Sequence, residues 1–410
     1  MGEEELNRQI AIWGAGNQGR YAYYALKREY DVAGFLDADV KLKQAEIVDG
    51  KKVLDFYPDK YFIIIACGGW IDVSRSLIKK GLKLCVDFIP YNMFLGKNVQ
   101  LDILLDCFGV TTTIDYLNRV KNKKKIALIY GNCQVEIIAN MMEYNKDFEK
   151  QYLLLRVPQV HLYRCEKQID SLFYSNGIMQ LIDLFIYQNV KANNRYNRKL
   201  GTVNILNMLS SECRKMPIHN IYFDGYFIQY DTNEERYLRN MNEKDFPYTD
   251  YIVEELLENN KNTDEIMALI NDENLVEPEK IIEKCRKSID NLRARERNVE
   301  IPIVDYIEKG YIKEQLFYTH NHPKNKVMYE YVKRILRALG INKADVFTEE
   351  ELDIEFGTLR LNNFPIFPCV IKALKLEKYE SKMRISYIDS HLVTMDEYIR
   401  EYLFRCYEMK

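Results

Sequence analysis

The stretch IALIYGNCQ, residues 126–134, decides the fold of the larger part of this chain. Its first five residues are apolar and mostly branched or aromatic, which predicts a buried β-strand over 126–130. The residues that follow turn directly into a predicted helix over 135–144, with apolar side chains recurring on one face. A strand that leads straight into a helix is typical of an α/β sheet.

Cys133 lies at the start of this predicted helix, and that position predicts a reactive thiol. A free thiol has a pKa near ~8.5, which the unpaired N–H groups and the positive dipole end of a helix lower toward the thiolate. The same N–H groups can stabilise a developing oxyanion. We therefore expect Gly131, Asn132 and Gln134 to contact the substrate or its oxyanion.

Composition indicates an ordinary globular protein. The chain has 410 residues, long enough for two or three domains, and is 47% hydrophobic and 29% charged. A net charge of -3 gives no basic field for nucleic acid, so DNA and RNA are not expected as main partners. No stretch approaches the ~20 apolar residues of a membrane span, and the acidic start is not a signal peptide. Nine cysteines without framework spacing indicate reduced thiols, so we expect a cytoplasmic protein.

Residues 1–95 predict a Rossmann-like domain with a parallel sheet. A short strand over 10–13 precedes a glycine-rich loop and a helical segment, and a second strand follows over 32–36. Further alternation of strands and helices extends to residue 88, which is typical of a doubly wound sheet. The expected nucleotide-binding residues are the loop glycines, which permit close phosphate approach, and an acidic residue for a ribose hydroxyl: Gly14, Gly16, Gly19 and Asp37.

This segment, roughly 8–90, resembles the Rossmann-like N-terminal domain of bacterial sugar acyltransferases. That resemblance rests on the glycines and Asp37, and it implies a nucleotide or a nucleotide-linked sugar as ligand. The alternative is a domain that keeps the fold without the ligand or serves only for assembly.

A linker is expected over 96–123, where the periodicity is weak and mixed, and a second α/β domain over 124–410. Two further predicted strands of this domain end on polar residues, the run 181–188 on Gln188 and the run 220–226 near Asp224. Open α/β sheets build their sites at such strand ends. A helical insertion is expected at about 231–300, where apolar residues recur at three- and four-residue spacing among basic ones: Ile282, Cys285, Ile289 and Leu292. These basic residues either contact phosphates or form a solvated face.

The second chemical motif is LFYTHNHP, residues 316–323, which precedes a predicted amphipathic helix over 326–339. Because proline is favoured in the first helical turn, His320, Asn321 and His322 are predicted to lie in the loop before that helix. Two histidines at i and i+2 in an extended segment point to opposite sides, so only one is expected to face a site with Cys133.

Three chemical interpretations fit these motifs. In the first, Cys133 is a nucleophile or part of an acyl-handling site, a histidine of the loop is the base, and Asp224 or Asn321 orients it. In the second, His320, His322 and Cys133 bind zinc, although no further ligands with metal-site spacing accompany them. In the third, the motifs only cap helices and pack the core.

The chain resembles the WcbI family of polysaccharide-biosynthesis acetyltransferases over roughly residues 124–410. The resemblance rests on the motif 130–134, the segments 183–188 and 220–226, Leu292 with Arg295 and Glu296, the loop 317–323 and the tail 365–368. It implies an enzyme that uses acetyl-coenzyme A to O-acetylate a sugar of a capsular or other surface polysaccharide, or its precursor. It also implies an active site with Cys133 and His322, and with Gln134 and Gln188 nearby. His320 departs from the family pattern, which commonly has an apolar or aromatic residue there.

The sequence therefore predicts a Rossmann-like domain fused to an acetyl-coenzyme A-dependent O-acetyltransferase with no metal. The alternatives are an SGNH-like esterase or deacetylase, with cysteine in place of serine, and a non-catalytic sugar-nucleotide-binding scaffold. The acceptor sugar and the oligomeric state are left open, including a homo-oligomer.

Overall fold

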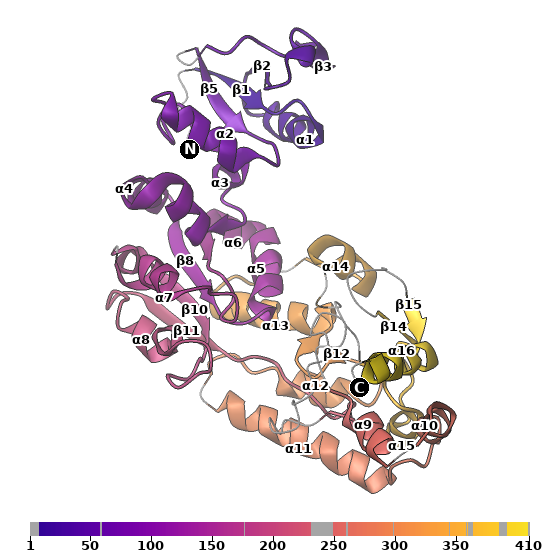
Figure 1. Ribbon diagram of the computed structural model, residues 1–410. Helices are drawn as coiled ribbons and strands as arrows, with labels where there is room; N and C mark the ends of the chain where they lie inside the picture. Colours follow the sequence, from indigo (N-terminus) through magenta and orange to yellow (C-terminus); the bar gives the residue numbers. More distant parts are fainter. Residues whose placement is uncertain are drawn as a thin grey trace. The chain divides into compact units, whose positions relative to one another are not determined.

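The computed structural model divides the chain into two compact units (Figure 1). One unit comprises Met1–Tyr130, Lys146–Ile186 and Val190–Lys215, and the other comprises Gly131–Asn145, Tyr187–Asn189 and Met216–Lys410. The structure describes residues 8–57, 60–175, 177–230, 249–259, 261–297, 299–343, 345–357, 359, 364–384 and 392–408. The predicted α/β class is confirmed, because parallel strands alternate with helices along much of the chain.

The first unit begins with a four-stranded parallel sheet. Its strands, in spatial order, are β2 (Val32–Leu36), β1 (Gln9–Trp13), β5 (Tyr61–Ile65) and β6 (Phe88–Pro90). Helices α1 (Asn17–Leu26) and α2 (Trp70–Lys79) connect them, and β3 (Glu46–Val48) pairs with β4 (Lys51–Lys52). Since the strand order reverses at β1, the sheet is doubly wound, as the alternation of strands and helices predicts.

Residues 96–123, predicted as a linker, contain regular structure. After α3 (Tyr91–Leu95) come β7 (Val99–Gln100) and the long helix α4 (Leu101–Lys121). Gly109 interrupts α4 with a φ of 76°. Because the two helical segments on either side are out of phase, their apolar positions do not follow one period, which explains the weak sequence pattern. The domain boundaries at 95 and 124 stay predictions.

A five-stranded sheet lies largely in the first unit. Its spatial order is β11 (Arg214–Ile218), β10 (Leu184–Gln188), β8 (Lys125–Tyr130), β9 (Tyr152–Arg156) and β7. Strand β9 runs parallel to both β8 and β7. The central strand β8 is buried along its whole length after Lys125, which explains why it reads as a continuous apolar run. The shorter helices of this unit are α6 (Lys146–Gln151), α7 (Glu166–Ile169) and α8 (Thr202–Leu206).

The prediction of a strand over 220–226 is wrong. The strand of this region is β11, which ends at Ile218, and residues 219–224 belong to no strand or helix. The backbone of residues 221–224 bonds instead to a side-chain amide, to the His320 carbonyl and to a serine hydroxyl. These bonds take the place of pairing with a neighbouring strand, so the apolar residues of this segment can be buried without one.

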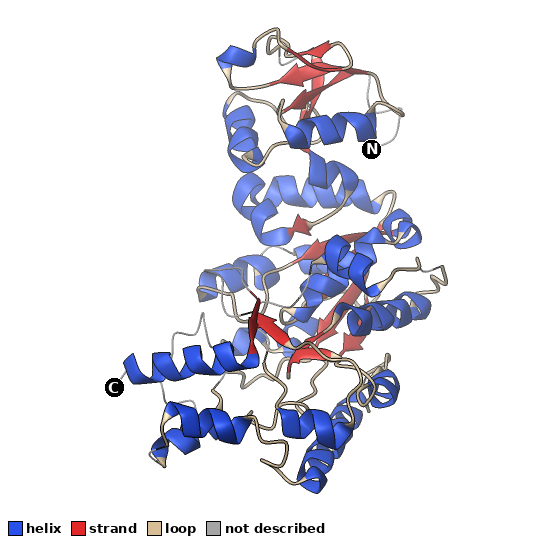
Figure 2. Cartoon of the chain, turned by 90° about the vertical axis from the view of Figure 1, so that its right-hand side faces the viewer, coloured by secondary structure: helices blue, strands red, loops and turns tan. Residues whose placement is uncertain are grey.

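The second unit is mainly helical in its described residues (Figure 2). Its helices are α5 (Gln134–Tyr144), α9 (Tyr251–Glu258), α10 (Thr263–Ile270), α11 (Pro278–Glu296), α12 (Val304–Gly310), α13 (Asn325–Ala338), α14 (Glu349–Phe356), α15 (Pro368–Leu374) and α16 (Met395–Glu408). Strand β12 (Phe317–Thr319) pairs antiparallel with β13 (His322–Pro323), and β14 (Lys382–Arg384) pairs antiparallel with β15 (Leu392–Thr394). Among the described residues, no helix combines the length and the apolar character needed to cross a membrane.

Helix α11 carries the pattern that predicts a helical insertion. Cys285, Ile289 and Leu292 are buried as expected, whereas Ile282 is largely exposed and Ile281 takes its place in the core. Most of the basic residues around this face are exposed. Residues 231–248 of the predicted insertion lie outside the described part of the chain.

Candidate active site

The structure brings Cys133 and His322 together, although 189 positions separate them in the chain. The Sγ atom of Cys133 lies 3.5 Å from Nε2 of His322. Cys133 caps the N-terminus of α5, directly after β8, and His322 is the first residue of β13. Both side chains are partly exposed, so a ligand can reach them. A thiol and an imidazole in this arrangement can exchange a proton.

The pKa of the Cys133 thiol is raised to about 11, because burial disfavours the thiolate. The N–H groups of Cys133 and Gln134 act in the opposite direction but lower the pKa less. The expectation of a lowered pKa is therefore wrong. The N–H groups at the helix N-terminus lower the pKa, but burial of the sulfur by the surrounding residues raises it by more. At neutral pH the thiol is protonated in the unliganded protein.

Gln134 connects the segments on which the site depends. Its Nε2 donates to the carbonyl oxygens of Ile221 and Asn321, at 2.8 Å each, and its Oε1 accepts from the Ile221 N–H at 2.9 Å. The side chain has no exposed surface. It therefore holds residue 221 and the turn before His322 against the start of α5. The predicted contact between Gln134 and substrate is corrected accordingly, because a fully buried side chain cannot touch one.

Gln188, the last residue of β10, supports the turn before Cys133. Its Oε1 accepts from the Asn132 N–H at 2.8 Å, and its side chain is almost completely buried. Gly131 lies against it so closely that a Cβ atom there would lie 2.4 Å from the same oxygen. Both residues therefore shape the turn, which corrects the predicted substrate contact of Gln188. The side chain of Asn132 closes the turn, because its Oδ1 accepts from the Gln134 N–H at 3.0 Å.

His322 lies in a tight hairpin and not in a loop that enters a helix. Thr319 of β12 pairs with His322 of β13, and the Thr319 hydroxyl donates to Asn321 Oδ1 at 2.9 Å. Helix α13 begins only at Asn325, so the prediction that Pro323 lies in its first turn is wrong. A proline is tolerated in β13 because this strand is only two residues long.

His320 lies in an aromatic cluster. Its ring is buried and stacks on Tyr230 with 3.8 Å between ring centroids, and Tyr222 lies 4.7 Å away. The pKa of His320 is well below 6.5, mainly through burial and also through the charges of His322 and Lys284. A neutral, stacked imidazole fits a packing role. A catalytic role for His320 stays a prediction.

Asp224 has no hydrogen bond to either histidine of the hairpin among the described residues. Its backbone N–H donates to the Ser288 hydroxyl at 3.0 Å. Burial raises the pKa of the Cys285 thiol to about 12, and the negative charge of Asp224 adds to this shift. The predicted orientation of the base by Asp224 therefore has no structural counterpart.

The glycine-rich loop of the first unit adopts the expected tight turn. Gly14 has a φ of 117°, and a Cβ atom on Gly19 would lie 1.7 Å from the Gly14 carbonyl oxygen, so both positions require glycine. At Gly16 no atom lies within 4 Å of such a Cβ atom. Asp37 accepts hydrogen bonds from the N–H groups of Ala15 and Asp39 at 2.8 and 2.9 Å. The carboxylate thus closes the loop, and its contact with a ribose stays a prediction.

Two buried residues of the second unit were not singled out for the site by sequence reasoning. His219 and Glu296 form an ion pair at 3.2 Å, and the backbone two residues after His219 bonds to Gln134. The isolated histidine carries no spacing signal, and Glu296 is one of the residues that carry the family resemblance, which assigned it no role in the site. Among the described residues, no three or more histidine, cysteine or acidic side chains gather in a way that could hold a metal ion.

Comparisons with known proteins identify the family to which the chain belongs. The model of the family described as "Polysaccharide biosynthesis enzyme WcbI" matches residues 126–344. A solved structure of WcbI, described as the native protein without a disulfide bond between coenzyme A and one of its cysteines, shares the fold with a TM-score of 0.58. The two chains are 18% identical, and the similarity covers 70% of this chain and 90% of that one. No curated protein matches the sequence. Because the family match spans more than half of its residues, this chain belongs to the WcbI family of polysaccharide biosynthesis enzymes.

Proposed function

We propose that this protein is an acetyl-coenzyme A-dependent O-acetyltransferase that modifies a sugar of a capsular or other cell-surface polysaccharide, or its precursor. The observation that carries the proposal is the 3.5 Å approach of Cys133 Sγ to His322 Nε2 in a partly exposed site. The family is one of polysaccharide biosynthesis enzymes, and the solved relative is described in terms of coenzyme A and a cysteine. Acetyl-coenzyme A would supply the acetyl group.

His322 is the general base of the proposed reaction. In a covalent route, Nε2 removes the proton of the Cys133 thiol, the sulfur attacks the acetyl carbonyl carbon, and the thioester bond to coenzyme A breaks, so that coenzyme A leaves as a thiol with the proton from His322. A sugar hydroxyl then attacks the acetyl group on the sulfur and passes its proton to His322, which returns it to the released Cys133 sulfur. In a direct route, Nε2 removes the proton of the sugar hydroxyl itself. The raised pKa of Cys133 means that the covalent route needs this base, because the thiol is protonated at neutral pH.

The backbone of the turn offers one amide for an oxyanion. The N–H groups of Asn132 and Gln134 are already bonded to Gln188 and to the Asn132 side chain. Among the described residues, the Cys133 N–H makes no hydrogen bond outside its own residue, and it lies at the positive end of α5. We assign it the role of oxyanion donor.

The four-stranded sheet of the first unit is proposed to hold a nucleotide or a nucleotide-linked sugar at the loop between Gly14 and Gly19. The open space at Gly16 supports this part of the proposal. All cysteines in the described part of the chain are free thiols, which fits a reducing compartment. We therefore place the reaction in the cytoplasm.

The proposal is tested by acetyl transfer from acetyl-coenzyme A to a panel of sugars and sugar nucleotides, with release of free coenzyme A as the readout. Because a positioned base contributes about 10²–10⁴ in rate, His322→Gln is expected to lose about that factor. Cys133→Ser separates the routes, since only the covalent one requires the thiol. Full transfer by both variants would contradict the proposed site.

Two further outcomes would replace the assignment. Ester hydrolysis without coenzyme A would identify an esterase with the same cysteine and histidine. Binding of nucleotide sugars that depends on the Gly14 loop, with no turnover, would identify a scaffold. A melting-temperature shift with coenzyme A gives an independent measure, because a ligand at 100 times its dissociation constant stabilises a protein by about 2.7 kcal/mol.

A further inference from the structure

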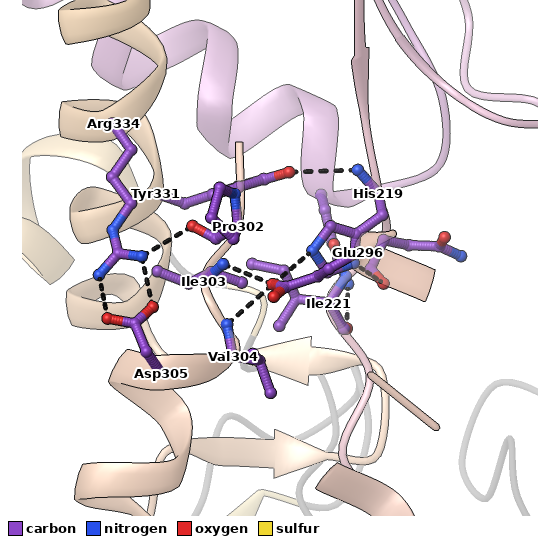
Figure 3. Close-up of polar contacts among 11 residues, drawn as sticks. His219, Ile221, Glu296, Pro302, Ile303, Val304, Asp305, Tyr331 and Arg334 are labelled. Atoms are coloured by element: carbon purple, nitrogen blue, oxygen red, sulfur yellow. Dashed lines mark hydrogen bonds and ion pairs between the residues drawn. The ribbon is translucent and has the colours of Figure 1, made fainter. Parts of the chain in front are cut away.

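The second unit contains a buried ion pair outside the chemistry proposed above. Nε2 of His219 lies 3.2 Å from Oε1 of Glu296, and the two side chains are only 6% and 7% exposed. Figure 3 shows the Glu296 carboxylate between the His219 ring on one side and the backbone of Ile303 and Val304 on the other. Burying two ionisable groups this deeply is costly unless each is paired and hydrogen-bonded.

Glu296 meets that condition through a single oxygen. Its Oε1 accepts from His219 Nε2 and from the N–H groups of Ile303 and Val304, the last at 2.8 Å. Burial raises the pKa of Glu296, but the hydrogen bonds from His219, Ile303 and Val304 together lower it further, so that the net direction is down. The carboxylate is therefore ionised at neutral pH.

The His219 ring faces an acceptor at each of its nitrogens. Nδ1 lies 3.2 Å from the carbonyl oxygen of Asn220, and Nε2 faces the Glu296 carboxylate. Both oxygens can only accept, so a ring that carries a proton on each nitrogen satisfies both contacts, whereas a neutral ring satisfies one. The other titratable group against the ring is Tyr331 of α13, whose hydroxyl accepts from the His219 backbone N–H at 3.1 Å.

The ion pair is connected to the active site through two residues. Ile221, two positions after His219, exchanges two hydrogen bonds with the Gln134 side chain, and Gln134 also bonds to Asn321. Gln134 follows Cys133, and Asn321 precedes His322. The segment 219–221 therefore contacts the side chain of Gln134. Gln134 in turn holds the positions of Cys133 and His322, whose Sγ and Nε2 atoms are 3.5 Å apart.

We propose that His219 is a positioning residue, whose hydrogen bond to the Glu296 carboxylate holds residues 219–221 against Gln134 and so sets the geometry of Cys133 and His322. This inference rests on the proposed function for its meaning in catalysis, but its structural content is independent of it.

The chain offers an isosteric test and a matched control. Glu296→Gln keeps an amide oxygen for all three donors and removes only the charge. Asp305→Asn removes a carboxylate from a second ion pair, with Arg334, that Figure 3 shows on the neighbouring helices. Arg334 also donates to the Pro302 carbonyl oxygen, so the control pair lies beside the segment that bonds to Glu296, but Asp305 makes none of the hydrogen bonds of Glu296 itself. A charge effect on the site is therefore expected for the first variant and not for the second.

The first measurement is the protonation state of His219 in the full chain, followed by ¹⁵N NMR of histidine-labelled protein, with His219→Asn assigning the signals. The inference predicts a proton on Nε2 of His219, donated to Glu296, and a changed Nε2 signal in Glu296→Gln. A wild-type ring whose Nε2 carries no proton would overturn it. This result is obtained on wild-type protein even when a variant fails to fold.

The second measurement is the rate at which iodoacetamide alkylates Cys133 at pH 8, read by mass spectrometry of the peptide that contains it. Because burial suppresses the thiolate, a loosened site is expected to react about threefold faster or more in Glu296→Gln. The Asp305→Asn rate should equal that of the wild type. Equal rates in all three proteins would overturn the positioning role. Neither measurement uses an acetyl donor. If both give the expected results and the transfer assay fails, the proposed function is contradicted and the positioning role of His219 is not.

Discussion

At Cys133 two physical effects oppose each other. The backbone N–H groups at the start of α5 stabilise the thiolate, and the packing around the sulfur destabilises it more strongly. The net pKa of about 11 makes Cys133 a poor nucleophile until a base acts on it. His322, 3.5 Å away, is placed to be that base. In the proposed reaction the pair acts as a unit, and the reactivity of the cysteine depends on a residue of the hairpin.

Alkylation of Cys133 should rise steeply with pH. Since only the thiolate reacts, its rate is expected to increase about tenfold for each pH unit between 7 and 9, because the titration midpoint lies near pH 11. The measurement is the iodoacetamide rate at Cys133 in wild type, with Cys133→Ser as the blank. A rate that levels off below pH 8 would show instead a preformed thiolate and imidazolium pair.

The two reactive residues could be predicted from the sequence, and their environments could not. Gly-Asn-Cys-Gln after an apolar strand points to Cys133, and the repeated histidines point to the hairpin. Which histidine faces the sulfur depends on the turn between β12 and β13, which directs His320 into the aromatic cluster with Tyr230. The sign of the pKa shift at Cys133 depends on residues from distant segments that bury it.

At the level of elements, the turn between β8 and α5 depends on a close approach. A Cβ atom at residue 131 would lie 2.4 Å from Gln188 Oε1 and 2.7 Å from Val135 Cγ1. The Gln188 oxygen cannot move without losing its bond to the Asn132 N–H. Glycine is therefore required by space, since the backbone there is not left-handed.

Gly131→Ala is expected to destabilise the protein by about 1–3 kcal/mol and to lower acetyl transfer, because the displaced Gln188 no longer supports the turn. Urea unfolding and the transfer assay measure the two effects. Gly68→Ala is the control, since no atom lies within 4 Å of its Cβ position and its φ is not left-handed. Equal stability of the two variants would show that the turn tolerates a side chain.

Elements that pair or pack locally were predictable, and those defined by distant contacts were not. Strands β1, β2, β5, β8, β9 and β10 and the helices α5, α11 and α13 follow their apolar periodicity. The strand predicted over 84–88 overlaps β6 only at Phe88, because residues 85–87 form a turn. The segment 220–226 has the composition of a strand but makes hydrogen bonds to side chains from α5 and α11 and to the His320 carbonyl oxygen. Pro323 resembles a helix start, yet pairing between β12 and β13 places it in a strand.

At the level of the molecule, Asp250 links stability to pH. It is completely buried, caps α9 through a bond from the Val253 N–H at 3.0 Å, and lies near Glu254. Burial raises its pKa to about 7, and the charge of Glu254 adds to the shift. The folded state thus holds a proton that the unfolded state releases near pH 4. The free energy of unfolding is therefore highest below about pH 4 and falls as the pH rises toward 7.

Asp250→Asn is expected to remove this loss, on the order of 2 kcal/mol at pH 8, because an amide keeps the cap without a charge. Unfolding free energies at pH 5 and pH 8 measure it. Asp305→Asn should instead lower the free energy of unfolding, because the hydrogen bond with Arg334 lowers the pKa of the Asp305 carboxyl and thus stabilises the folded state when this group is ionised. If the wild type and Asp250→Asn each have the same free energy of unfolding at pH 5 and pH 8, Asp250 does not link stability to pH.

The sequence by itself determined the α/β class, the family and the identity of the thiol and the imidazole, because these depend on local periodicity and on short motifs. The tertiary structure alone decided which histidine meets the sulfur, that Gln134 and Gln188 support the site from inside, and that His219 and Glu296 form a buried pair. Each of these depends on contacts between segments far apart in the chain, and on the loss of solvent that changes the energy of a charge. No local sequence pattern indicates either of these effects.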